Sequence, residues 1–218
     1  MITLIISYLA GPALAALLFV YIKYRYPNGY FGLLIRSYFW GIIGTVFAAI
    51  FFYIAYSLGY IELKNLRRMI FYSFFILGFG QELGKFVVLR YMVLPSKYFK
   101  NPSDGIIYSL MISFGAATAL NIGALLLYPE TDPAGLISRT LVAISFAVIM
   151  GFFVGMGKHR SNRLIDSLTG LLGAAFFHGS FEFILITDDQ LLLWPFLVGS
   201  AVITYLFVLK SLHISDDN

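Results

Sequence analysis

The sequence predicts an all-α fold, a polytopic bundle of about seven transmembrane helices. Of its 218 residues, 60% are hydrophobic and only 12% are charged, whereas soluble domains carry roughly 25% charged residues. The mean hydropathy is +0.85. Seven apolar stretches are each about 20 residues or longer, which is the length that a helix needs to cross the hydrocarbon core of a bilayer.

The seven predicted spans follow one another with short connections. They cover residues 2–22, 31–59, 69–94, 105–128, 134–156, 164–186 and 191–212. Polar breaks that contain proline, glycine or aspartate separate several of them, at 26–29, 101–104, 129–133 and 187–189. The first stretch is longer than the apolar core of a signal peptide, about 7–15 residues, so we expect a retained span. Short connections make neighbouring helices antiparallel, and the chain 1–218 is expected to form a single membrane domain.

Basic residues in the connections predict an N-terminus outside the cell and a C-terminus in the cytoplasm. With this orientation the cytoplasmic segments hold Lys23, Arg25, Lys97, Lys100, Lys158, Arg160, Arg163 and Lys210, and the outer segments hold only Lys64, Arg67 and Arg68. We expect an integral protein of the cytoplasmic membrane of a bacterium or archaeon. No basic run reaches five residues, so nucleic acid is not an expected partner. The absence of cysteine excludes disulfides, thiol nucleophiles and cysteine-ligated metals.

A few polar side chains lie inside the predicted spans, where a charge is costly and is therefore a candidate for function. They are Gln81, Glu82 and Lys85 in the third span, Asn121 in the fourth, and His178 and Glu182 in the sixth. Glu82 and Lys85 are three residues apart and His178 and Glu182 are four apart, so each pair shares a helix face. Glycine and alanine flank both clusters and let helix backbones approach closely. We expect the third and sixth spans to pack with these faces inward, with Asn121 lining the same cavity.

A carboxylate and an imidazole that face one cavity can activate water. This predicts hydrolysis of an amide inside the bilayer, with Glu82 as general base and His178 orienting the water or donating to the oxyanion. Glu182 would hold the tautomer of the imidazole. No metal or other cofactor is expected, because metal-bound water usually needs three protein ligands. Only one histidine lies within a span, and His159 and His213 lie in cytoplasmic segments.

Each of these residues also has a structural interpretation. Glu82 and Lys85 form, on this view, an internally neutralised pair that holds helices together, and His178 is a hydrogen-bonded packing residue. Asn121 is an interhelical hydrogen-bonding residue, and Glu182 is a solvated residue near the outer loop. A third class of function, proton relay in a transporter, is weaker because the chain shows no inverted repeat.

Taken together, the motifs resemble the PrsW family of intramembrane proteases, in the superfamily that includes the CAAX-processing proteases and the Aph subunit of gamma-secretase. The family pattern E-E-x-x-K is matched by Gln81-Glu82-Leu83-Gly84-Lys85. Its D-G-x-x-Y-G is matched by residues 104–109, its G-F-A-x-x-E-N by the segment ending at Asn121, and its H-x-x-x-D by residues 178–182. The resemblance covers roughly residues 71–186 and implies Glu82 as the remaining base and His178 as its partner.

The chain departs from the family pattern at four positions. Gln81 replaces the first glutamate, Leu120 replaces the glutamate before the asparagine, and Glu182 replaces the final aspartate. The fifth span has no histidine around residues 143–151. Two hypotheses follow. The first, which we prefer, is a protease that cuts a membrane protein in or near a transmembrane segment. The second is an inactive Aph-like scaffold that binds the transmembrane helices of a partner, so the sequence leaves catalysis open.

Overall fold

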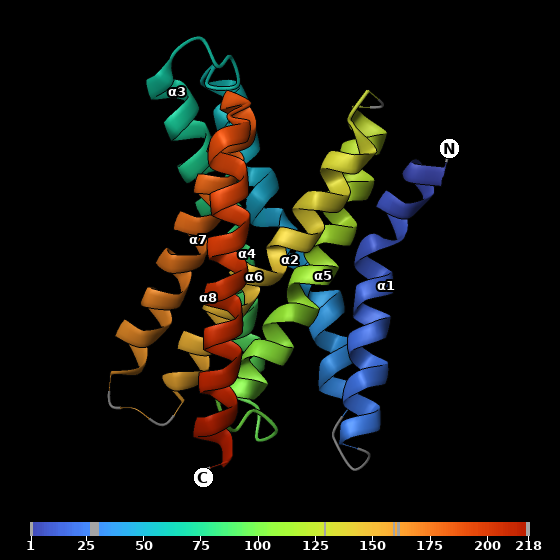
Figure 1. The fold of residues 1–218 in the computed structure, drawn as a ribbon, viewed down its shortest axis with the longest axis vertical. Coiled ribbons are helices and arrows are strands. Elements are labelled where there is room, and N and C mark those ends of the chain that lie inside the picture. Colours follow the sequence, from blue (N-terminus) through green and yellow to red (C-terminus); the bar gives the residue numbers. More distant parts are fainter. Residues whose placement is uncertain (1, 27–30, 129, 159, 161, 217–218) are drawn as a thin grey trace.

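The computed structural model describes residues 2–26, 31–128, 130–158, 160 and 162–216, and these residues form helices and connections without a β-strand (Figure 1). Six long helices are α1 (Ile2–Arg25), α2 (Phe31–Ser57), α5 (Pro102–Leu127), α6 (Pro133–Met156), α7 (Arg163–Thr187) and α8 (Gln190–Asp216). Each of the six is long and apolar enough to cross a membrane, counted over the described residues. The predicted breaks at 27–29 and 129, and His159, lie outside the described residues.

The third predicted span is a rod of four consecutive helical segments. They are α3 (Leu66–Phe71), the π-helix η1 (Tyr72–Phe79), α4 (Gly80–Val87) and the π-helix η2 (Val88–Val93). The residues that join them have right-handed helical dihedral angles, so the rod is continuous. With this rod the described chain contains seven helical rods, which confirms the predicted all-α bundle. The orientation of the termini stays a prediction.

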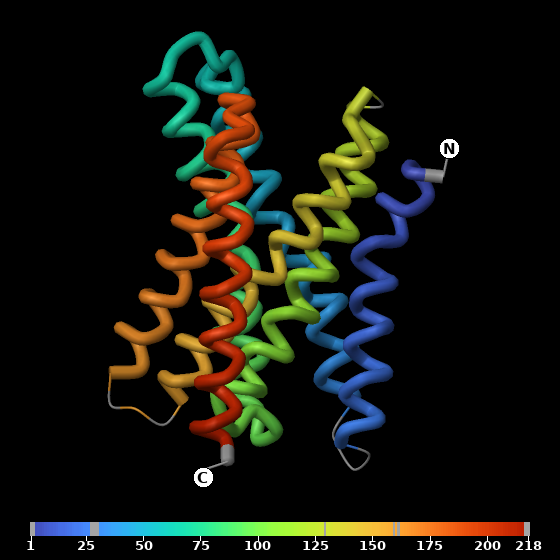
Figure 2. Tube along the Cα trace, in the orientation of Figure 1, coloured from blue at the N-terminus to red at the C-terminus, as the bar shows by residue number. Residues whose placement is uncertain are grey.

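Successive rods run antiparallel, and the start of α1 and the end of α8 lie toward opposite ends of the long axis (Figures 1 and 2). The long helices differ in how many residues are buried in the 18-residue apolar stretch of each. The buried share is 56% in α5, 56% in α6 and 50% in α7, but only 17% in α1 and α2 and 6% in α8. The three helices that carry Asn121, Arg139 and His178 are therefore central, and α1, α2 and α8 form the lipid-facing periphery.

Capping residues set where the central helices begin. The side chain of Asn101 accepts from the backbone N–H of Asp104, and Asp104 accepts in return from the backbone of Asn101, with Pro102 in the first turn of α5. Asp132 caps α6 in a similar way through the backbone N–H groups of its first turn. These bonds satisfy helix donors that otherwise lack partners. The Asp104 of the family-like motif is thus a structural cap.

Glycines let two pairs of rods approach closely. A Cβ atom at Gly78 of η1 would lie 2.6 Å from the carbonyl oxygen of Ala175, and one at Gly179 of α7 would lie 2.7 Å from Phe74 Cα. Neither position has room for a larger residue without separation of η1 from α7. Gly105 of α5 and Gly151 of α6 meet backbone to backbone in the same way. The η1–α7 contact brings the polar segment of α4 against that of α7.

Candidate active site

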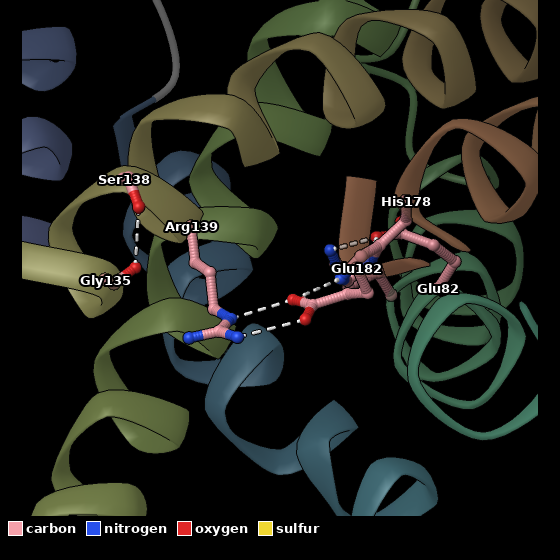
Figure 3. A network of polar contacts seen from close by, with 7 residues as sticks. Glu82, Gly135, Ser138, Arg139, His178 and Glu182 are labelled. Carbon is pink, nitrogen blue, oxygen red and sulfur yellow. Dashed lines mark hydrogen bonds and ion pairs between the residues drawn. The ribbon is translucent and has the colours of Figure 1, made fainter. Parts of the chain in front are cut away.

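Two polar helices meet at a carboxylate in the middle of the bundle. The Lys85 ammonium donates to Glu82 Oε1 at 2.5 Å, one turn along α4. From α7, the imidazole of His178 contributes Nδ1 to the same oxygen at 2.7 Å (Figure 3). The structure therefore brings together three of the residues that the sequence singled out, and the expected inward packing of the third and sixth spans is seen.

A second carboxylate lies on the other edge of the imidazole. Glu182 Oε1 is 3.8 Å from His178 Nε2, one turn away on α7. Both oxygens of Glu182 accept from the guanidinium of Arg139 on α6, at 2.8 Å from Nε and 3.1 Å from Nη2 (Figure 3). This fork is the geometry in which arginine binds a carboxylate most strongly. A chain of polar contacts thus runs from Lys85 through Glu82, the imidazole and Glu182 to Arg139, with a cation at each end.

All but one of these side chains are buried. Glu82 is 0% exposed, Glu182 2%, Lys85 5% and His178 6%, whereas the Arg139 side chain is 41% exposed. Phe146 of α6 stacks on the imidazole with ring centroids 4.8 Å apart and thereby fixes its plane. With Lys85 and Arg139 positive and both glutamates negative, the cluster is neutral when the imidazole is neutral, as burial in a bilayer demands. The expectation that Glu182 is solvated is wrong, because Arg139 covers it.

The cluster closes the inner end of a cavity of about 410 Å³ between the rods α5, α6 and α7 and the η1–α4 segment. Its polar lining consists of Tyr72, Gln81, Lys85, Ser113, Asn121, Tyr128, Thr131, Arg139, Thr140, His178 and Glu182, and alanines and leucines supply most of the remainder. Leu63 and Thr131 also line the cavity. They belong to two connections at the end of the bundle where α1 begins, so the cavity reaches that end. Glu82 itself is fully buried behind His178 and Lys85.

Asn121 lines the cavity but is already engaged. Its amide group donates to the carbonyl of Ser7 at 3.0 Å and to the hydroxyl of Thr140 at 3.1 Å. These bonds tie α1 and α6 to α5, which favours the interhelical interpretation. Gln81 contributes to the wall of the same cavity.

Three residues of the site were missed by sequence reasoning. Arg139 stands near the start of a predicted span, where a long cationic side chain usually reaches the headgroups, and Phe146 is one of many apolar residues in the same span. Both lie on α6, seven residues apart and so on one face. The third is Ser113, whose hydroxyl is buried in the cavity wall and has no hydrogen-bond partner among the described residues.

Comparison with known proteins decides the family. The model of a family described as "PrsW family intramembrane metalloprotease" matches residues 30–210. The chain belongs to the PrsW family. It is 32% identical to protease PrsW of Bacillus subtilis over 203 residues, covering 89% of each chain. It is 29% identical to protease PrsW of Oceanobacillus iheyensis over 196 residues, 86% of each, and 28% identical to that of Geobacillus kaustophilus over 201 residues, 89% of this chain and 84% of the relative. No solved structure matches the chain.

Membership in the PrsW family confirms the resemblance and the integral membrane location, and it supports a PrsW-like protease that acts on membrane proteins in the lipid bilayer. Its relatives above are bacterial. The Aph-like scaffold is not favoured, because the matched relatives are named as proteases.

The word metalloprotease in the family description implies a metal, and the residues of this site do not fit one. The described residues contain no group of three or more histidine, aspartate or glutamate side chains placed to hold an ion. The two nitrogens of His178 face different carboxylates. The ammonium of Lys85 lies against Glu82 Oε1, and Arg139 occupies both oxygens of Glu182. Cations of the protein thus already hold the positions that a metal would take.

Proposed function

We propose that this chain hydrolyses a peptide bond in or near a transmembrane segment of a membrane protein, with Glu82 and His178 acting together as the general base. The hydrogen bond of 2.7 Å between these two side chains, at the inner end of a cavity that reaches one end of the bundle, carries the proposal. A paired carboxylate and imidazole is an arrangement that withdraws a proton from water at neutral pH.

In this proposal the two residues have different tasks. An ionised carboxylate only accepts, so the proton of this bond is on Nδ1 and the neutral imidazole presents Nε2 as an acceptor. His178 Nε2 takes a proton from water as the water oxygen bonds to the carbonyl carbon of the substrate. Glu82 stabilises the imidazolium that forms. The imidazolium then returns the proton to the amine nitrogen as the carbon–nitrogen bond breaks. Glu82 therefore acts as a base through His178.

The cavity wall supplies donors for the oxygen that becomes negative. The Lys85 ammonium, the Gln81 amide and the Ser113 hydroxyl all line it, and hydrogen bonds aimed at a developing oxyanion lower the barrier. A neutral Gln81 serves this task without the proton that the family's first glutamate carries. Glu182, held by Arg139, faces Nε2 and orients the water.

The position and lining of the cavity indicate which substrate segments can enter it. It opens at the end of the bundle where Leu63 and Thr131 lie, which is the outer end in the predicted orientation. Its walls contain Ala116, Ala117 and Ala143, so the segment that enters is expected to carry small or apolar side chains next to the bond that is cut.

The test compares the wild-type chain with Glu82→Gln in cells, by mapping new N-termini of membrane proteins. General-base catalysis contributes roughly 10²–10⁴-fold, so we expect Glu82→Gln and His178→Ala to abolish detectable processing. Glu62→Gln is the matched control, because Glu62 pairs only with Lys64 at the surface (57% and 69% exposed side chains) and lies outside the cavity lining. Equal processing by wild type and by a folded Glu82→Gln variant would refute the proposal. Ser113→Ala, which removes no bond of the folded chain, should slow cleavage without loss of stability.

A further inference from the structure

A second cavity lies at the opposite end of the bundle from the candidate active site. It occupies about 690 Å³ where α5 begins and where α6 and α8 end. Four basic residues line it, Lys97, Lys100, Lys158 and Arg160, and its described lining contains no acidic residue. Nothing in the proposed hydrolysis uses this cavity, which therefore calls for a separate explanation.

The cavity is amphipathic. Between the cations, its lining includes the apolar side chains of Phe99, Met156 and Ile214. Phe99 is only 1% exposed, so it belongs to the packed core and forms a fixed surface. A ligand that fits both parts of this lining has an anionic group joined to an apolar or weakly polar body.

One of the four cations is held in place by the fold. Lys158 donates to the carbonyl oxygen of Leu94 at 2.7 Å and lies 5.9 Å from the centroid of the Phe99 ring. Burial, together with the neighbouring positive charge of Arg163, lowers the pKa of Lys158. Four cations and no acidic residue line the described part of the cavity, so an anion bound there would reduce the repulsion between them.

The other cations remain accessible. Lys97 is exposed, and the guanidinium of Arg160 is 3.7 Å from a carboxylate oxygen of Asp166, with 59% of its side chain exposed. A loose exposed pair of this kind contributes little to stability. Both side chains can turn toward an anion in the cavity at low cost.

We propose that this cavity binds the phosphate of an anionic phospholipid headgroup, with the apolar lining against the glycerol and the first methylene groups. Its position at the ends of α5, α6 and α8 places it at the level of the headgroups. Basic pockets between transmembrane helices are the sites at which proteins bind such headgroups. The lipid would add a contact that joins the ends of the three helices.

The test is native mass spectrometry of the full chain in detergent, titrated with phosphatidylglycerol and, for comparison, with zwitterionic phosphatidylcholine. The informative variant is Lys97→Gln/Arg160→Gln, which removes two exposed cations from the cavity. The matched control is Lys23→Gln/Arg25→Gln, which removes two exposed cations at the same end of the bundle from α1, outside the cavity. Thermal melting of each variant in detergent shows that it is folded.

We expect one tightly bound phosphatidylglycerol and weaker binding of phosphatidylcholine. Each cation near an anionic lipid contributes about fivefold in affinity, so the cavity variant should bind roughly 30-fold more weakly and the control should change by less than about twofold. The charge-preserving variant Lys97→Arg/Arg160→Lys should bind like the wild type. Equal weakening in both glutamine variants would mean diffuse surface attraction and overturn the proposal. Inorganic phosphate that binds as tightly as the lipid would overturn the lipid as its source.

Discussion

The ion pair between Arg139 and Glu182 allows a quantitative test of how this site is stabilised. The perturbation is Arg139→Met, which keeps an apolar stem on α6 and leaves the carboxylate of Glu182, 2% exposed, without its partner. Removal of one partner from a buried pair costs about 3–5 kcal/mol. Because 41% of the Arg139 side chain is exposed, solvent screens part of this interaction, and we expect a loss of about 2–3 kcal/mol in the free energy of unfolding.

A double-mutant cycle isolates the interaction itself. Glu182→Gln and the double variant complete the cycle, and we expect a coupling free energy of about 2 kcal/mol, within the range found for residues in one ionic network. The matched control is the pair Lys64–Glu62, which at 2.5 Å is shorter than the 2.8 Å of Arg139–Glu182 but has 69% and 57% exposed side chains. Exposed pairs contribute about 0–1 kcal/mol.

The assay is reversible unfolding in mixed micelles of dodecylmaltoside and dodecylsulfate, followed by circular dichroism. A coupling for Arg139–Glu182 no larger than that of Lys64–Glu62 would refute the argument that burial of Glu182 makes the pair strong. The same variants report on function, because Arg139→Met should lower kcat for cleavage more than it raises KM if Glu182 only orients the water and does not hold the substrate.

Three further predictions concern packing, metal and orientation. Gly179→Val should lower the free energy of unfolding by about 1–3 kcal/mol and remove most of the activity, because its Cβ would lie 2.7 Å from Phe74 Cα and would separate His178 from α4. The control Gly123→Val should leave the melting temperature unchanged, because its Cβ meets no described atom within 4 Å. Metal chelators should leave cleavage within about twofold, and elemental analysis should find no stoichiometric metal; activity lost to a chelator and restored by zinc would contradict the geometry. Because the chain has no cysteine, Lys64→Cys should react with an impermeant maleimide on intact cells and Lys97→Cys only after lysis, and the reverse pattern would invert the predicted topology.

Much of the fold follows from composition and spacing because the bilayer leaves few alternatives to helices. The pairing of His178 with Glu82 was also predictable in outline. Small residues such as Gly78 and Gly179 mark the faces where helices approach, and the polar side chains lie on the same faces. The π-helical segments on either side of α4 had no visible sequence signal, although such segments often occur near functional sites.

The direction of a long side chain near a helix end was not predictable. Arg139 follows the cap of α6 by seven residues, and from there a guanidinium can reach either the headgroups or the bundle interior. Only the position of Glu182 on α7, across the bundle, decides between the two. For the same reason the sequence left open whether Glu182 faces His178 or solvent, because its partner Arg139 lies on another helix, 43 positions away.

Two of the four departures from the family pattern, Gln81 and the missing histidine of the fifth span, share one electrostatic explanation. A second carboxylate at position 81 would add a negative charge that neither Lys85 nor Arg139 neutralises, since each is already paired with a glutamate. With Gln81 in that position the cluster is neutral without a further cation. The fifth span, which lacks the family's histidine, contributes the cation Arg139 and the stacking ring Phe146 to the imidazole and its carboxylate. Loss of one carboxylate and the poor fit to a metal are therefore consequences of the same charge balance. A neutral His178 completes this balance, and a neutral imidazole is the form that can accept a proton from water.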